Sequence, residues 1–167
     1  RLTIAQEAAV LSPPVFSQFA ITDYLDTFDW RGQIVAFRDM YRGRRDAMLR
    51  GLTANMPPGC AWTHPTGGFF VWLTMPEGLD SQSMLPRAVS ARVAYVPGTA
   101  FYADGLGSRN MRLSFCFPSE ERIVEGTRRL GEVIHDELDM LRTFGIDAGT
   151  VEAVHRDLTT GPAPDIT

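Results

Sequence analysis

The sequence predicts an α+β fold of two layers, in which a mixed sheet of about four strands is covered by long helices. Three observations lead to this prediction. Residues 28–53 form a long amphipathic segment, four short segments rich in aromatic and β-branched residues follow, and residues 119–144 form a second long amphipathic segment. Strands joined partly by turns and partly by one helical segment, with long helices left to cover one face, are typical of a two-layer α+β domain.

The first 27 residues predict helices that do not belong to this sheet. Residues 3–11 and 15–25 each favour a helix, and prolines separate the two. Apolar residues such as Phe16 and Phe19 recur at helical spacing but have no sheet of their own to cover. We therefore expect residues 1–27 to be the end of another domain, with interdomain helices leading into the sheet domain.

The sheet domain is expected over residues 28–142. Its first helix has Asp29 as the expected N-cap, because an aspartate directly before an apolar-periodic run can accept a hydrogen bond from a free backbone N–H. Five arginines and two interleaved aspartates between residues 38 and 50 indicate a solvated helix face. Residues 143–167 are expected to be an extension that is partly disordered.

Four strands are expected after the first long helix, and they are recognised by their β-branched and aromatic residues and by the turns between them. The expected strands are residues 61–64, 68–74, 93–96 and 110–115. A helix over residues 81–91, with Asp80 as its N-cap, lies between the second and third strands. Ser119 is the expected N-cap of the last long helix.

Composition excludes several classes of function. The formal net charge of −4 and the absence of a basic patch argue against binding to nucleic acid or to an anionic membrane. No apolar run reaches the roughly 18 residues of a membrane-spanning helix, and no signal peptide is recognisable. Cys60, Cys116 and the three histidines match no spacing of metal ligands. We expect a protein of the cytoplasm without a metal site.

All sixteen basic residues counted as lysine or arginine are arginine, so the chain contains no lysine. A guanidinium group stays protonated at any ordinary pH and cannot supply the free amine that a Schiff base requires. Covalent imine chemistry would therefore have to come from outside this chain.

Arg112 lies in the middle of the last predicted strand, between apolar neighbours. It can be a surface residue on a half-exposed sheet, or its planar fork can bind a carboxylate through two parallel hydrogen bonds. Gly67 and Gly68 precede the second strand, where glycine permits either a tight turn or the close approach of a ligand. Phe101 and Tyr102 follow the third strand, and core packing explains them as readily as a pocket does.

Four motifs occur in one order along the chain. They are Tyr41-Arg42-x-x-Arg45-Asp46-Ala47-Met48, Pro65-x-Gly67-Gly68-x-Phe70-x-Trp72, Val96-Pro97-Gly98-x-x-Phe101-Tyr102 and Arg112-Leu113-Ser114-Phe115. Together they resemble the C-terminal part of class I/II (fold type I) aminotransferases that depend on pyridoxal phosphate (PLP). The resemblance is closest to the α-aminoadipate/kynurenine and aromatic aminotransferase branch, and it runs from about residue 1 to residue 138.

The resemblance implies a transaminase that transfers an amino group between an α-amino acid and a 2-oxo acid. It implies a homodimer with an upstream PLP-binding domain and a small domain built from the segment seen here. It places the substrate's α-carboxylate on Arg112, and it places Phe70 in the substrate pocket with Gly68 beside it. In the family, the lysine that carries PLP and most phosphate ligands lie upstream of this segment, so this chain is expected to be inactive by itself.

One residue departs from the family pattern, and two other functions remain open. Arg92 stands where the family usually has a glycine, and a left-handed helix end would cost arginine roughly 1 kcal/mol relative to glycine. The alternatives are the aminotransferase-like effector domain of a transcription regulator and a non-catalytic domain that uses Arg112 to bind an acid. The run Phe70-Val71-Trp72 favours the enzyme.

Overall fold

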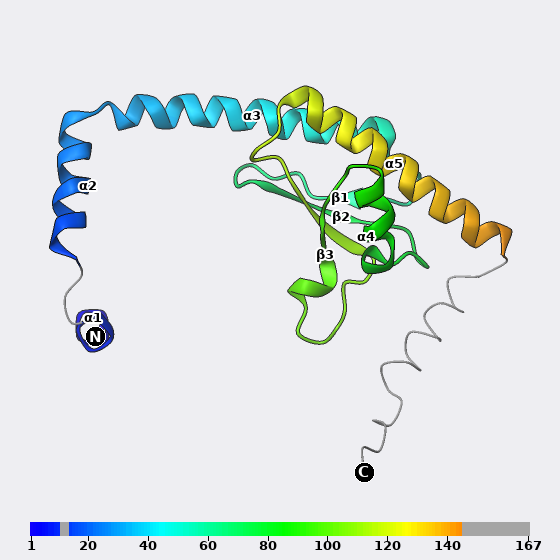
Figure 1. The fold of residues 1–167 in the computed structure, drawn as a ribbon, viewed down its shortest axis with the longest axis horizontal. Helices are drawn as coiled ribbons and strands as arrows, with labels where there is room; N and C mark the ends of the chain where they lie inside the picture. The colour runs from blue at the N-terminus through cyan, green and yellow to red at the C-terminus, as the bar shows by residue number, and fades with distance from the viewer. Residues whose placement is uncertain (11–13, 145–167) are drawn as a thin grey trace, which may run out of the picture. The chain divides into compact units, whose positions relative to one another are not determined.

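The computed structural model describes residues 1–10 and 14–144 of the chain (Figure 1). Contacts along the chain divide it into two units, Arg1–Met40 and Tyr41–Thr167, which are described separately here. The predicted extension at residues 143–167 lies almost entirely outside the described residues, and the predicted boundary between residues 27 and 28 stays a prediction. None of the described helices combines the length and hydrophobicity that a bilayer-spanning helix requires.

The first unit consists of helices that bury no side chain. It contains α1 (Leu2–Val10), α2 (Val15–Thr27) and the beginning of α3 (Trp30–Asn55). The predicted N-cap of α3 is confirmed, because the Asp29 carboxylate accepts a hydrogen bond of 2.9 Å from the Gly32 N–H. Neither α1 nor α2 has a buried residue, and the expected exposure of their apolar side chains is confirmed.

This exposed apolar surface should make the chain self-associate, because apolar patches beyond a few hundred Å² usually mark interfaces. Phe16 is 84% exposed and Phe19 is 71% exposed. We expect the sedimentation coefficient of the chain to rise with concentration, and the double variant Phe16→Ser/Phe19→Ser to reduce that rise. Phe117→Ser, which removes an exposed phenylalanine from the other unit, is the matched control and should leave the rise unchanged. A stable monomer across a wide concentration range would contradict this prediction.

The second unit contains a sheet of four strands, as predicted. The strands are β1 (Ala61–Trp62), β2 (Phe70–Thr74), β3 (Val96–Pro97) and β4 (Asn110–Ser114), in the spatial order β1-β2-β4-β3. All three strand pairings are antiparallel, whereas we expected a mixed sheet. The reason is that β2 and β3, which helix α4 (Ser81–Ser90) connects, run in the same direction but have β4 inserted between them.

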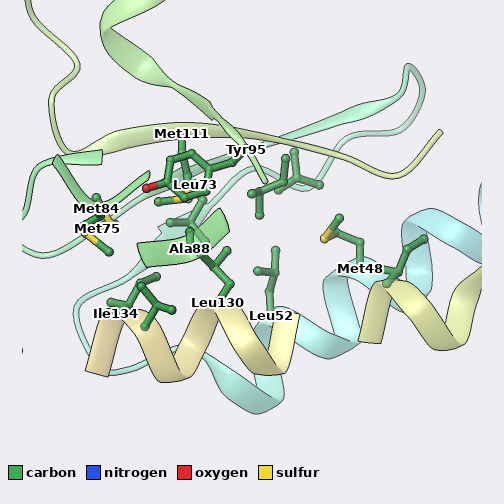
Figure 2. Close-up of a cluster of buried hydrophobic side chains, with 14 of the residues drawn as sticks. Met48, Leu52, Leu73, Met75, Met84, Ala88, Tyr95, Met111, Leu130 and Ile134 are labelled. Carbon is green, nitrogen blue, oxygen red and sulfur yellow. The ribbon is translucent and has the colours of Figure 1, made fainter. Parts of the chain in front are cut away.

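Helices cover one face of the sheet and make the two layers that the sequence predicts. Alternate residues of β2 and β4 are buried on this face, with Leu73 and Met111 fully buried. The covering helices are α4, the second half of α3, and α5 (Glu120–Thr143) (Figure 1). Figure 2 shows Leu52 of α3 and Leu130 of α5 pointing toward the sheet from the helical layer. Burial of this apolar face is the main stabilising contribution to the unit.

Helices α3 and α5 pack at very close range. A Cβ atom added to Gly131 of α5 would collide with the backbone carbonyl oxygen of Asn55, the last residue of α3. The Asn55 side chain donates a hydrogen bond of 2.7 Å to the Gly51 carbonyl oxygen, so the end of α3 is also fixed from within the helix. The absence of a side chain at Gly131 therefore permits this crossing.

Arg92 ends α4 in the left-handed conformation, with φ of 61°, and it is the one non-glycine residue of positive φ in the described part of the chain. The Val93 N–H donates to the Ala88 carbonyl oxygen and the Arg92 N–H to the Val89 carbonyl oxygen, both at 2.9 Å. These two hydrogen bonds make a Schellman motif, in which glycine is the usual residue at the position of Arg92. In this chain, arginine therefore occupies the left-handed position of the turn.

Replacing Arg92 with glycine should stabilise the unit. Left-handed backbone costs a residue with a Cβ atom about 1 kcal/mol more than glycine. We expect Arg92→Gly to raise the free energy of unfolding by about 1 kcal/mol in urea denaturation. Arg92→Ala is the matched control, since it removes the guanidinium but keeps the Cβ atom, and it should bring no comparable gain. Equal effects of the two variants would show that the side chain, and not the backbone conformation, is responsible.

Candidate functional site

Arg112 lies in the middle of the sheet, on the face opposite the helical layer. It pairs with Trp72 of β2 on one side and with Val96 of β3 on the other. Met111 and Leu113 point into the core, so Arg112 shares the outer face of β4 with Asn110 and Ser114, as the alternation of the sequence predicts. The central position of β4 places Arg112 between β2 and β3.

Two aromatic rings contact this guanidinium group. The Arg112 Cζ atom lies 4.1 Å from the ring centre of Phe70 and 4.9 Å from that of Phe101. Phe70 comes from β2, and Phe101 ends the short helix η1 (Gly98–Phe101). A guanidinium group over an aromatic ring is attracted by about 0.5–2 kcal/mol, depending on how far it is removed from water. The two rings therefore fix the direction of the arginine side chain.

Trp72, the cross-strand partner of Arg112, contacts one of these two rings. Its ring packs edge-on against Phe101, with centroids 5.3 Å apart, and it also lies 6.3 Å from the ring of Tyr102. The aromatic residues after the third strand thus lie beside the second strand, although 29 positions separate Trp72 from Phe101 in the sequence. We call Phe70, Trp72, Phe101 and Tyr102 the aromatic cluster.

The donors of Arg112 remain available for a ligand. Within residues 1–10 and 14–144, no acidic group forms an ion pair with its guanidinium, and no hydrogen bond engages it. A half-buried cation without a partner favours an anion, and the planar fork of arginine matches a carboxylate through two parallel hydrogen bonds. The geometry is suited to holding a carboxylate against aromatic side chains.

Gly68 differs from Phe70 and Arg112 because its role in the structure comes from its backbone conformation and not from a side chain. Its φ is 77°, a conformation that side chains with a Cβ atom rarely adopt, and a Cβ atom built there would meet nothing within 4 Å. The backbone of the turn before β2 therefore favours glycine at this position, and the space around its Cα atom is open. This turn leads directly into Phe70, so Gly68 positions the start of the strand that carries the ring.

Three members of the aromatic cluster, Trp72, Phe101 and Tyr102, were not among the predicted site residues. The signal for Phe101 was present, since it follows the turn after the third strand, but that position fits a core residue equally well. Trp72 reads as a residue of a buried strand. The pairing of β2 with β4 makes Trp72 the neighbour of Arg112, and the pairing of β3 with β4 brings Phe101, which follows β3, to the guanidinium group.

No family model matches the chain. It is 44% identical over 138 residues to aromatic-amino-acid aminotransferase 1 of Thermococcus litoralis, and the match covers 83% of this chain and 33% of that protein. The crystal structure of a multiple substrate aminotransferase from Thermococcus profundus matches with a TM-score of 0.75 and 42% identity over 82% of this chain and 34% of that one.

A further solved structure carries a derivative of the cofactor. The α-aminoadipate aminotransferase of Thermus thermophilus, complexed with N-(5'-phosphopyridoxyl)-L-leucine, has a TM-score of 0.72 and 34% identity, over 83% of this chain and 36% of that one. The chain is homologous to the C-terminal part of PLP-dependent aminotransferases. The second unit has the fold of the aminotransferase small domain.

The aminotransferase resemblance seen in the four sequence motifs is thus confirmed. The chain spans about a third of the length of the curated relatives it matches. Among less similar relatives is an uncharacterised helix-turn-helix transcriptional regulator of Escherichia coli, at 26% identity over 83% of this chain and 29% of that protein.

Proposed function

We propose that the chain is the part of a PLP-dependent aminotransferase that binds the α-carboxylate of the substrate. Arg112 would hold this carboxylate, Phe70 would line the substrate pocket, and Gly68 would set the turn that leads into Phe70. The observation that supports this proposal is the unpaired guanidinium fork between the rings of Phe70 and Phe101. The reaction of the complete enzyme would move an amino group between an α-amino acid and a 2-oxo acid.

Arg112 would act by orientation. Two parallel hydrogen bonds to a carboxylate fix both its position and its plane, which a point charge such as an ammonium group does not. Once the carboxylate is fixed, rotation about the bond to Cα is the main freedom left to the amino acid. A reacting bond held in the correct direction reaches the transition state with less loss of entropy. The rings of the aromatic cluster would exclude water from one side of the ion pair.

The residues of this chain do not fit the cofactor itself. PLP is held in its enzymes as an imine, and this chain contains no lysine that could form one. No step of the imine chemistry therefore belongs to residues of this chain. The proposal assigns the lysine and the phosphate site to an upstream PLP-binding domain and expects a cytoplasmic homodimer.

The chain alone should neither retain PLP as an imine nor transaminate. Its only primary amine is the amino terminus at Arg1. The purified chain is incubated with PLP and reduced with borohydride, and the pyridoxyl group is mapped by mass spectrometry. We expect no stoichiometric adduct at an internal residue. An internal adduct formed in equal amount to the chain would refute the assignment of the imine to another domain.

The activity itself is tested in a chimeric enzyme. In this chimera, the present chain replaces the matching C-terminal third of the Thermococcus litoralis aminotransferase, to which it is 44% identical. We expect the chimera to transaminate α-amino acids with 2-oxo acids. A chimera that folds and binds PLP, but does not react with any amino acid, would contradict the proposed function.

The effector domain of a transcription regulator is the second candidate, and the match to the Escherichia coli regulator favours it. Such a domain would use Arg112 to bind an acid ligand without turning it over. The chimera separates the two functions, because a pure effector domain would bind the amino acid and leave it unchanged. The higher identity to enzymes than to the regulator supports the aminotransferase.

A further inference from the structure

A pocket of the sheet domain, separate from the Arg112 site, lies where β3 separates from β4. Strand pairing was expected over residues 93–96, but β3 begins only at Val96. Extending the register of Val96 and Arg112 by two residues would pair Ala94 with Ser114. These two residues instead line a pocket of about 170 Å³. The pocket occupies the gap that a longer β3 would have closed.

The opposite wall of this pocket is apolar and comes from the helices. Ile123 and Leu130 of α5 and Met48 of α3 line it, together with Leu113 of β4. These four side chains belong to the hydrophobic core, each being less than a tenth exposed. A ligand in the pocket could therefore lay an apolar body against the core itself.

Two arginines line the same pocket, and neither has a partner among the residues that the structure describes. Arg92 comes from the left-handed end of α4, and Arg122 from the first turn of α5. Neither guanidinium group forms an ion pair or a hydrogen bond with a described residue. Both side chains therefore have donors available for an anion.

One acid in this part of α5, Glu125, does not compensate these charges. Glu125 accepts hydrogen bonds from Arg128 and from Arg129. These two guanidinium groups lower the pKa of Glu125 to about 2, so its charge is already matched. Arg129 also donates to the Ala91 carbonyl oxygen at 3.4 Å, which ties the end of α4 to α5 beside the pocket.

From this arrangement we infer that the pocket between α5 and residues 92–94 binds a small carboxylate that carries an apolar body. The carboxylate would lie between Arg92 and Arg122, and the apolar body would lie against Leu113 and the α5 wall. A cavity of about 150 Å³ accommodates benzene, so the body would have about six heavy atoms. A small inorganic anion would satisfy the arginines but leave the apolar wall uncovered.

The backbone at Arg92 supports this inference. Glycine would make the same Schellman turn without strain but would present no guanidinium at the pocket. Arg92 therefore places a charged side chain at the pocket, although its left-handed backbone conformation lowers the stability of the domain. Arg92→Gly should consequently change stability and binding in opposite directions.

Hexanoate is the probe, and the 167-residue chain carrying Arg112→Gln is the background, so that the proposed substrate site cannot contribute. Binding is followed by ligand-observed NMR titration. We expect Arg122→Gln and Arg92→Gly each to weaken hexanoate binding by about tenfold, because each removes a charge-assisted contact. Arg92→Gly should at the same time raise the melting temperature, which rules out misfolding as the cause. Arg109→Gln is the matched control, because Arg109 does not line the pocket and already pairs with Glu77 at 3.5 Å. This variant should bind hexanoate as tightly as the Arg112→Gln background does.

Two ligands test the two halves of the inference. Hexan-1-ol lacks the charge, and acetate lacks the apolar body, so each should bind at least tenfold more weakly than hexanoate. If hexanoate binds equally well after Arg122→Gln and Arg92→Gly, or if it does not bind the background at all, the inference is wrong. Because Arg112 is absent from every variant, this failure would leave the proposed aminotransferase function untouched.

Discussion

Replacing Arg112 with lysine in the chimeric enzyme should lower kcat/KM for every α-amino acid by at least tenfold. Lysine keeps the positive charge but loses the planar fork, and each charge-assisted hydrogen bond contributes about 1.5–3 kcal/mol. Arg112→Ala loses both the charge and the fork and should lower kcat/KM further. The rings of Phe70 and Phe101, which contact the guanidinium, would not hold an ammonium group in the same direction.

The choice of substrate provides the control for this experiment. All α-amino acids carry the same carboxylate, so the loss should be similar for each of them, and it should shrink for amines without a carboxylate. If Arg112 were only a surface residue, its replacement would leave the kinetics unchanged and alter stability by no more than about 0.5 kcal/mol. If the Arg112→Ala variant reacts at the rate of the parent enzyme, Arg112 does not bind the carboxylate and the proposed site is wrong.

Gly131→Ala should destabilise the sheet domain by about 1–3 kcal/mol, because an added Cβ atom would force α5 away from the end of α3. The atom that it meets is the backbone oxygen of Asn55, which cannot rotate aside as a side chain can. The free energy of unfolding is measured by urea denaturation of the chain. The separation of the two helices should also expose part of the core around Leu130.

Gly126 is the matched control, because it lies in the same helix and a Cβ atom there would meet nothing within 4 Å. Alanine is favoured over glycine in a helix by about 0.5–1 kcal/mol. Gly126→Ala should therefore stabilise the chain while Gly131→Ala destabilises it. Two changes of the same sign would show that helix propensity, rather than the crossing of α3 and α5, governs both positions.

Features that depend on neighbouring residues could be predicted from the sequence. The N-caps at Asp29, Asp80 and Ser119 are all confirmed, because a cap needs only a short polar side chain before a run of helical residues. The alternation around Arg112 was also predicted correctly, since side chains of a strand point to opposite faces.

Features that depend on distant pairings could not be predicted. Residues 93–96 have the composition of a strand, but the Schellman turn at Arg92 directs the chain away from β4, and pairing begins only at Val96. The antiparallel sheet has a similar cause, because no local signal shows that β4 returns between β2 and β3.

The candidate site also contains residues that could be predicted from the sequence and residues that could not. Arg112, Phe70 and Gly68 stand out through the motifs that carry the resemblance, whereas their roles in binding remain predictions. Phe101 joins the site only because β4 lies between the elements that carry the two rings. The arginines on α3 were predicted to form a solvated helix face. Arg44, however, donates a hydrogen bond of 2.5 Å to the Cys116 carbonyl oxygen, a distant contact that no local pattern indicates.

The outer strands of the sheet bear on how the chain can aggregate. Both edge strands, β1 and β3, are two residues long, and β3 contains Pro97, which has no N–H to donate. Short edges and proline deprive another chain of a row of hydrogen-bonding groups to extend. Copies of the chain would then associate through the helices α1 and α2, and this association would reverse on dilution. The sheet would not extend from one molecule into the next.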